Sequence, residues 1–258
     1  MSPEITAAAV QQLRARTGVG IVAVKQALDD AAGDEEKAIE LLRKRGLSQA
    51  VKKADREQSE GAIFIAEAAG KAALVVLKCE TDFVGRNEAF VALGQELAES
   101  LAKNGAAGVK TLADAKLPEA VQKLGENITL GETLEVGAPI VASYVHSNRK
   151  IGVIIGVSAG DVAKAKDIAM HAAAMNPTYV HVDDVPAEAI AKEQEIWKEQ
   201  MKGEKKPPEI LEKIMLGKER KFREENALTK QPFVKDTSVT VEKYLGDSKI
   251  VAYHRIVI

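Results

Sequence analysis

Short apolar runs occur in two pairs along this 258-residue chain, and only a few residues separate the members of each pair. Runs 62–66 and 73–79 form the first pair, and runs 140–145 and 151–157 form the second. Such spacing favours antiparallel hairpins, because parallel strands need a crossover connection of about a dozen residues or more. Helical patterns are segregated from these hairpins and do not alternate with single strands. The sequence therefore predicts an α+β fold.

Residues 1–54 have the pattern of three short helices. Thr6 is a predicted N-cap of the first helix and Asp34 of the third, because both side chains accept hydrogen bonds from free helical N–H groups. A basic turn followed by Gly46 predicts the end of the third helix. The segment is expected to form a small three-helix domain, followed by a polar linker at 52–60.

The remaining chain contains further helical patterns. Asn87 is a predicted N-cap of a long helix that runs through Leu101, and Pro118 is predicted to begin another. A third helix is predicted at 161–175. The chain is predicted to end with a short helix at 239–244 and a strand at 250–258.

Residues 186–226 are unusually polar, because they hold ten basic and ten acidic side chains. The sparse apolar positions recur at helical spacing on both sides of a break at Gly203 and Pro207-Pro208. This pattern predicts an antiparallel helical hairpin with ion pairs at i,i+4, and an ordinary pair of solvated surface helices fits it equally well. The apolar positions are Ile190, Trp197 and Met201 on the first helix and Leu211, Met215 and Phe222 on the second.

These patterns divide the chain into four predicted regions. Two core units each combine a hairpin with a helix, near 61–104 and 139–175, which indicates an internal duplication with weak sequence identity. The regions are a three-helix domain at 1–54, a core unit at 55–138, a second core unit at 139–185 and 227–258, and the hairpin at 186–226 inserted in it.

The charge balance and cysteine content exclude several classes of protein. Lys and Arg number 36 against 38 Asp and Glu, so the net charge of −2 argues against a protein that wraps nucleic acid. A single cysteine, Cys79, cannot form an internal disulfide framework or a Cys-rich zinc site. No apolar run approaches the ~20 residues of a membrane-spanning helix, and Met1–Thr6 lacks the features of a secretory signal. A cytosolic protein is expected.

Chemistry at a small-molecule site is not strongly indicated. Gly18-Val-Gly20-Ile-Val-Ala23 fits the dinucleotide fingerprint, but that motif requires a preceding hydrophobic strand, and residues 7–16 have a helical pattern. A turn between helices is therefore favoured. None of the four histidines forms a helical i,i+4 pair or has a cysteine partner, so no metal, cofactor or catalytic triad is predicted. Cys79 lies on an apolar strand, which favours a buried, unreactive thiol.

The segment from Cys79 to Glu88 combines a predicted loop with apolar side chains. Phe83 and Val84 lie among charged residues between a buried strand and a long helix. Phe83 can fold back into the core, which the residue type favours, or it can project into a partner. An acid beside a projecting aromatic would suit disturbance of a partner's Mg²⁺ site, because Mg²⁺ demands near-ideal octahedral geometry.

The sequence resembles the translation elongation factor Ts family, whose members are nucleotide-exchange factors for elongation factor Tu. The resemblance rests on seven short motifs that occur in the family's order and approximate spacing. They are Leu13–Gly18 followed by Lys25–Leu28, Thr81-Asp-Phe-Val84, Gly125-Glu-Asn-Ile128, Ser143-Tyr-Val-His146, Ile168-Ala-Met-His171, Asn176-Pro177 and Gln231-Pro-Phe-Val234.

The resemblance implies roles for several residues. The three N-terminal helices match a ubiquitin-associated-type domain that docks on the G domain of elongation factor Tu. Asp82 and Phe83 match residues inserted beside the partner's Mg²⁺ site, with Thr81 and Val84 framing them. Further contact positions are implied for Arg14, Ile21, Val22, His146 and Val234, and the hairpin 186–226 matches a protruding coiled coil.

The predicted activity is release of GDP from elongation factor Tu without covalent chemistry. Members of the family commonly continue past the last strand into a C-terminal helical module. In this sequence the last predicted strand ends at Ile258, so the contacts of that module are not expected. Two other functions remain open on the sequence. One is a three-helix adaptor that binds a protein without exchange activity, and the other is a dinucleotide-dependent enzyme that uses Gly18–Ala23.

Overall fold

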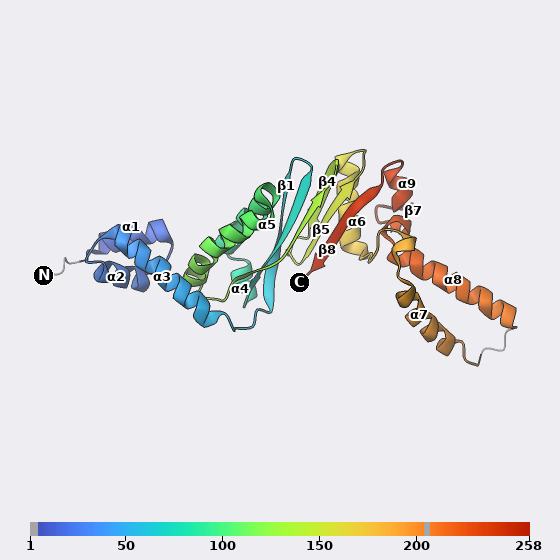
Figure 1. Cartoon of the computed structure of the whole chain (residues 1–258), viewed down its shortest axis with the longest axis horizontal. Helices are drawn as coiled ribbons and strands as arrows, with labels where there is room; N and C mark the ends of the chain where they lie inside the picture. The colour runs from blue at the N-terminus through green and yellow to red at the C-terminus, as the bar shows by residue number, and fades with distance from the viewer. Residues whose placement is uncertain (1–4, 204–206) are drawn as a thin grey trace.

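The computed structural model describes residues 5–203 and 207–258 and shows an elongated α+β protein (Figure 1). Three helices lie at one end, a pair of helices projects from the other, and two small sheets lie between them. The predicted three-helix region at 1–54 and the predicted hairpin at 186–226 fall partly on residues 1–4 and 204–206, which lie outside the described residues.

The N-terminal helices are α1 (Ala7–Thr17), α2 (Ile21–Asp30) and α3 (Glu35–Lys53). Both predicted N-caps are confirmed. The Thr6 hydroxyl accepts a hydrogen bond from the Ala9 N–H at 3.2 Å, and the Asp34 carboxylate accepts one from the Lys37 N–H at 3.1 Å. Side chains from all three helices fill a common core that includes Leu13, Val24, Leu28 and Leu42.

Two glycines in this region behave differently. Gly18 ends a helix as its residue type predicts, whereas Gly46 lies inside one. Gly18 has φ +66° and ends α1, so the fingerprint begins in a turn between two helices and continues into α2, and the dinucleotide alternative lacks its required strand. The predicted stop at Gly46 is wrong, because α3 continues to Lys53. A Cβ atom at Gly46 would lie 3.0 Å from the Pro118 carbonyl oxygen, so this glycine permits close packing of α3 on the core.

The first sheet has the order β1-β2-β3 and is antiparallel throughout. Its strands are β1 (Glu60–Ala68), β2 (Lys71–Cys79) and β3 (Thr129–Gly137), and α5 (Glu88–Leu124) covers one face. The hairpin of β1 and β2 is confirmed. Strand β3 was not predicted from the sequence, because its polar residues interrupt every short apolar run and only its pairing with β2 reveals it.

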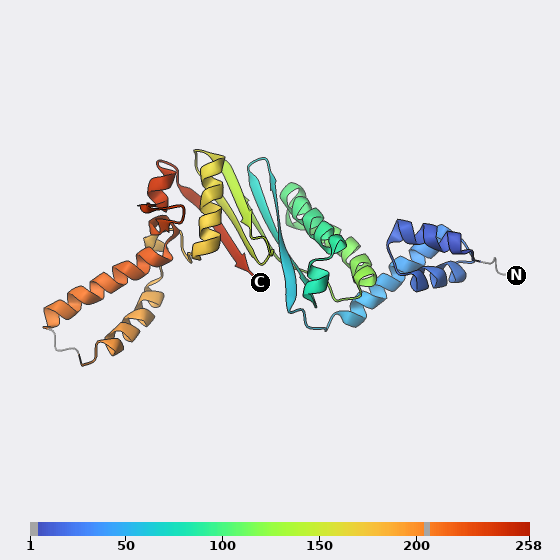
Figure 2. The same ribbon diagram turned by 180° about the vertical axis from the view of Figure 1, so that it is seen from behind.

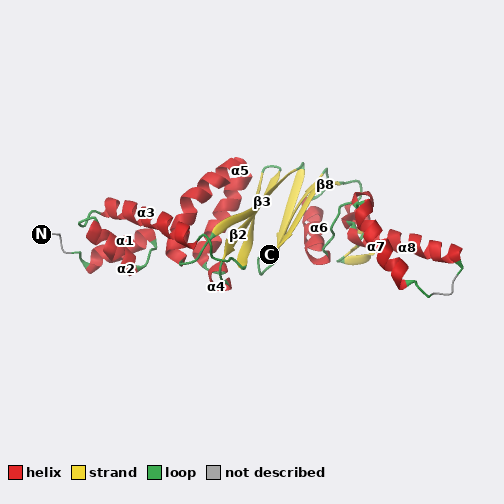
Figure 3. Ribbon diagram, turned by 60° about the horizontal axis from the view of Figure 1, so that its bottom comes forward, coloured by secondary structure: helices red, strands yellow, loops and turns green. Residues whose placement is uncertain are grey.

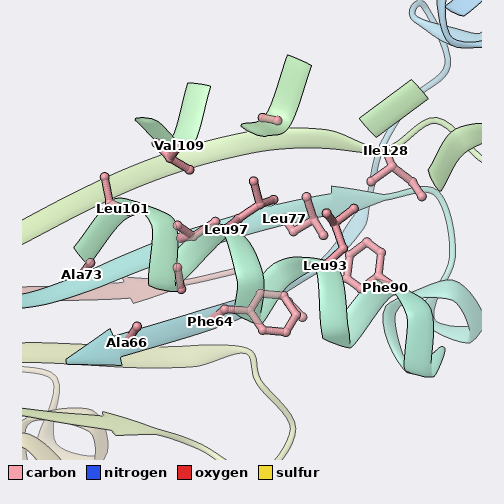
Figure 4. Packing of buried hydrophobic residues seen from close by; sticks show 14 of the residues in the cluster. Phe64, Ala66, Ala73, Leu77, Phe90, Leu93, Leu97, Leu101, Val109 and Ile128 are labelled. Carbon is pink, nitrogen blue, oxygen red and sulfur yellow. The ribbon is translucent and has the colours of Figure 1, made fainter. Parts of the chain in front are cut away.

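Strands β1 and β2 are apolar on both faces because both faces are covered. Phe64, Leu77 and their neighbours pack against Phe90 and Leu97 of α5, as Figure 4 shows. Ile63 and the alternate residues of these strands face the second sheet. This arrangement explains why the first pair of runs lacks the alternation of a strand with one solvated face.

The second sheet has the order β4-β5-β8 and is also antiparallel. Its strands are β4 (Ile140–Val145), β5 (Ile151–Val157) and β8 (Ile250–Val257), and α6 (Val162–Met175) covers its outer face. The sheets face each other and the helices lie outside them (Figures 2 and 3). A Cβ atom at Gly152 would lie 2.5 Å from Ile63 Cγ2, so the glycine allows this close approach.

The two core units share one order of elements. In each, a hairpin is followed by a helix, and a later strand then pairs with the second strand of the hairpin. This shared order is what an internal duplication would leave. The units differ in length, because the second contains the long segment between α6 and β8.

The helix α5 is interrupted at a position other than the predicted one. Gly105 has φ +68° and ψ −171°, which interrupts the helical path, and Pro118 lies well inside the second part of α5. The prediction that a helix begins at Pro118 is therefore wrong. Glycine accepts this backbone conformation without the steric cost of a Cβ atom.

The segment between α6 and β8 contains the projecting helices. The helix α7 spans Ala187–Gln200 and α8 spans Pro208–Asn226, and Trp197 meets Phe222 edge-on at 6.0 Å between ring centroids. Exposed i,i+4 ion pairs, such as Arg220–Glu224 at 2.8 Å, lie along α8. The other elements are the short turns Val182–Asp184 and Leu228–Lys230, β6 (Pro232–Phe233), β7 (Asp236–Thr240) and α9 (Val241–Leu245). Strands β6 and β7 were not predicted from the sequence.

Candidate functional site

The loop after β2 forms one helical turn, α4 (Asp82–Gly85), before α5 begins. Thr81 is the N-cap of this turn, and its hydroxyl accepts a hydrogen bond from the Val84 N–H at 3.4 Å. The N–H of Asn87 donates to the Val84 carbonyl at 2.9 Å, which joins the turn to the start of α5. These two hydrogen bonds close the turn and connect it to α5.

Phe83 points away from the core and is 83% exposed. The alternative in which Phe83 folds into the core is therefore wrong. Val84, the next residue of the turn, is buried and packs in the cluster between the first sheet and α5. Successive residues of a helix point about 100° apart, so burial of Val84 directs Phe83 outward. A large exposed aromatic side chain with an apolar anchor beside it is typical of a binding surface.

Asp82 is beside Phe83 and its carboxylate is partly exposed. It pairs with Arg86 at 3.1 Å, and both side chains are open to solvent. Such surface pairs contribute about 0–1 kcal/mol, so the carboxylate can exchange Arg86 for another cation at small cost. Asp82 and Arg86 also line a shallow cleft with Asn148 and Arg149 from the turn between β4 and β5.

His146 starts that turn and is exposed. Its N–H donates to the Ile151 carbonyl at 2.9 Å, and Tyr144 Oη lies 3.3 Å from His146 Nδ1. The structure thus brings the His146 turn and Asp82 to the two sides of one cleft. This proximity is not evident from the sequence, because the residues are far apart in the chain.

The N-terminal candidate residues are also exposed. Ile21 is 51% exposed and Val22 is 82% exposed at the start of α2, while Arg14 is exposed on α1. Val24 on the same helix is fully buried. The helix therefore buries one side in the domain core and leaves two adjacent apolar residues in solvent.

Val234 lies in a loop that is hydrogen-bonded to buried polar side chains. Its N–H donates to His171 Nδ1 at 3.1 Å, and His171 Nε2 donates to the Gln231 side-chain oxygen at 3.0 Å. His171 is fully buried, and burial lowers its pKa below the usual value. The Val234 side chain itself is partly exposed. The structure thus joins two motifs, Ile168–His171 and Gln231–Val234, that the sequence analysis noted separately.

Several buried or half-buried polar residues near these surfaces had no role predicted from the sequence. Gln231 also donates to the Glu225 carbonyl at 2.7 Å, which ties the end of α8 to the Val234 loop. Glu126 and Asn127, within the motif Gly125–Ile128, hydrogen-bond to the segment before Phe83. The motif was visible in the sequence, but its contact with the loop depends on the fold.

Cys79 is buried as predicted. Burial raises the pKa of its thiol to about 11, so the reactive thiolate is scarce at neutral pH. The residues that the structure describes contain no group of three or more His, Cys, Asp or Glu side chains arranged to hold a metal ion. Within that same part of the chain, no helix is long and apolar enough to cross a membrane.

The fold and its exposed side chains define a class of protein, an elongated α+β protein whose exposed apolar residues Val22, Phe83 and Val234 lie on separate segments. A family described as Elongation factor TS matches residues 80–258. The chain belongs to the elongation factor Ts family and is a translation elongation factor, which acts in protein biosynthesis.

Relatives match nearly the whole chain. Elongation factor Ts of Deinococcus radiodurans is 43% identical over 256 residues, which cover 95% of this chain and 97% of that protein. The Deinococcus deserti protein of the same name is 42% identical with the same coverage. Elongation factor Ts of Xanthomonas axonopodis pv. citri is 42% identical and is matched over 99% of this chain and 92% of its own length. The likeness therefore includes the N-terminal helices, which precede residue 80.

Proposed function

We propose that this chain promotes release of GDP from elongation factor Tu. Membership in the elongation factor Ts family implies an interaction with that partner. The observation that carries the proposal is the exposed Phe83 ring, held on a one-turn helix whose next residue, Val84, is anchored in the core. Translation elongation takes place in the cytoplasm, and this compartment is part of the proposal.

Phe83 and Asp82 act at the partner's nucleotide site in this mechanism. The Phe83 ring inserts between partner side chains, and the Asp82 carboxylate exchanges Arg86 for groups near the partner's Mg²⁺. Displacement of Mg²⁺ from octahedral geometry weakens its contacts with the phosphates, so GDP leaves faster. Thr81 and Val84 hold the turn that carries both side chains.

The activity is exchange and requires no covalent step by this chain. If the factor weakens GDP binding by a given ratio, GDP weakens binding of the factor by the same ratio. The partner is therefore bound in its GDP-loaded and nucleotide-free forms, and GTP entry expels the factor. No direct contact with nucleic acid is needed.

Other surfaces supply affinity and orientation. The helices within 1–54 form the docking domain of ubiquitin-associated type, and Arg14, Ile21 and Val22 contact the partner's G domain. His146 contacts the partner from the start of the turn that lines the cleft opposite Asp82, and Val234 contacts a distal domain of the partner. In this division, 55–138 and 139–185 with 227–258 are the two core units, and 186–226 is an inserted helical hairpin.

The test is release of fluorescent GDP from elongation factor Tu, with and without this chain. Replacement Phe83→Ala is expected to lower the stimulated rate by about tenfold or more, because exposed aromatic anchors dominate many interfaces. Its melting temperature should change little, since the ring makes no core contact. Leu216→Ala on α8 removes another exposed apolar side chain and serves as the control.

The same experiment separates the proposal from its alternatives. An unchanged release rate with Phe83→Ala would defeat the assigned role of the ring. Binding of the partner without any change in nucleotide release would identify an adaptor.

A further inference from the structure

One carboxylate, that of Glu126 between α5 and β3, holds the start of the Phe83 loop. Glu126 Oε2 accepts hydrogen bonds from the N–H groups of Glu80 and Thr81, each at 3.0 Å. Glu126 Oε1 accepts a hydrogen bond from the Thr81 hydroxyl at 2.5 Å. Three donors thus converge on a single side chain, and hydrogen bonds to an ionised acceptor are stronger than neutral ones.

The contact is reciprocal. The Glu80 carboxylate accepts a hydrogen bond from the Asn127 N–H at 2.7 Å. Two segments that lie about 45 residues apart in the chain are therefore joined by four hydrogen bonds. This set of bonds fixes the last residues before α4 in position relative to the end of α5.

The Glu126 side is itself firmly anchored. Asn127 is buried, and its side-chain amide donates to the carbonyls of Ala54 and Arg56 at 3.2 and 3.0 Å. Lys53, the last residue of α3, donates to the Gly125 carbonyl at 2.6 Å. The segment that clasps the Phe83 loop therefore also binds the end of the three-helix region, from which Ile21 and Val22 project.

The loop needs such external support. A four-residue helix is far shorter than the length at which isolated helices become stable. The Thr81 hydroxyl uses its proton for Glu126, which leaves its lone pairs to accept from the Val84 N–H. Glu126 thus orients the N-cap of the turn that presents Asp82 and Phe83.

We propose that Glu126 is a positioning residue for nucleotide exchange, which acts by holding the Phe83 loop in its binding-competent conformation. This inference rests on the proposed exchange activity. Because Glu126 acts through the loop, its removal lowers the fraction of molecules in which Phe83 is correctly placed, and the stimulated rate falls with that fraction. The docking surface on α2 is unaffected.

The first measurement is the rate of fluorescent GDP release from elongation factor Tu at saturating factor. Glu126→Ala is expected to lower the maximal rate about tenfold, while the factor concentration for half-maximal rate changes less. Glu126→Gln retains an oxygen for the two backbone N–H groups and is expected to recover most of the rate. Glu132→Ala, at an exposed site on β3, is the control and is expected to match the unaltered chain.

The second measurement is a double-mutant cycle with Phe83→Ala. If Glu126 acts through Phe83, Glu126→Ala has little further effect on release once the ring is absent. Full additivity of the two losses, or an unchanged rate with Glu126→Ala alone, would overturn the inference. If the unaltered chain also fails to accelerate GDP release, the proposed function itself is refuted. The two failures are therefore distinguishable.

Discussion

Two exposed loops carry proposed contacts with elongation factor Tu, and chemically different groups hold them. The Phe83 loop is held by Glu126, a carboxylate at the partly solvated edge of the first core unit. The Val234 loop is held by His171, a fully buried residue of α6 whose imidazole accepts the Val234 N–H. Both side chains fix backbone N–H groups directly before or within the loop that they support.

The difference shows how burial selects the supporting group. An ionised carboxylate can remain at a partly hydrated site, whereas burial of a charge without a partner is very costly. A neutral imidazole supplies one acceptor and one donor, which match the Val234 N–H and the Gln231 side-chain oxygen. The buried support is therefore expected to govern stability, and the solvated one chiefly the placement of a contact residue.

The largest expected effect on stability is that of His171→Ala. The change leaves a cavity and removes the partners of Val234 and Gln231, so the free energy of unfolding should fall by about 2–4 kcal/mol. Denaturation with urea measures this loss. Glu126→Ala is the matched comparison and should cost about 1 kcal/mol, because water can replace its carboxylate. Equal losses at the two sites would contradict the comparison.

The next largest effect on stability is expected from a fall in pH, which should act on His171. The folded pKa of His171 lies below its unfolded value, which is about 6.5, so the unfolded chain binds the proton more readily. Stability from neutral His171 is fully present above pH ~6.5 and is lost as pH falls toward the folded pKa, with a slope of at most about 1.4 kcal/mol per pH unit. The check is urea denaturation at several pH values. His171→Gln, which cannot titrate, should show a smaller acid dependence, and an identical dependence would exclude His171 as its source.

The smallest expected effect is at Val234, the exposed residue of the loop that His171 supports. Val234→Ala should weaken binding to elongation factor Tu about threefold, because a small aliphatic contact contributes less than an aromatic anchor. The factor concentration that gives half-maximal GDP release measures this change. Val251→Ala on β8 removes another exposed valine and provides the control. If Val234→Ala impaired GDP release as much as Phe83→Ala, the proposed ranking of the two loops would be wrong.

Local sequence signals located most helices and strands. Caps at Thr6, Asp34 and Asn87 lie where the side-chain chemistry predicts them, and the four apolar runs form β1, β2, β4 and β5. The failures share a physical cause. Gly46 lies inside α3 because packing on Pro118 outweighs its tendency to end a helix, and β3 exists because β2 offers a partner for its backbone.

The candidate site divides in the same way. The motif Thr81–Val84 was evident in the sequence, but residue type alone favoured a buried Phe83. The fold decided the matter, because Val84 fills the core and the ring next to it is left in solvent. The supports Glu126 and His171 could not be assigned from the sequence, since their partners lie far along the chain.

The sequence by itself determined the α+β class, the two hairpins, the charged helical segment and the motifs of the elongation factor Ts family. These features depend on periodicity and residue type over short windows. Only the tertiary structure decided which motifs meet, which of two adjacent apolar residues is exposed, and which side chains hold the loops. Those outcomes depend on packing and hydrogen bonds between distant segments, and local patterns carry no record of them.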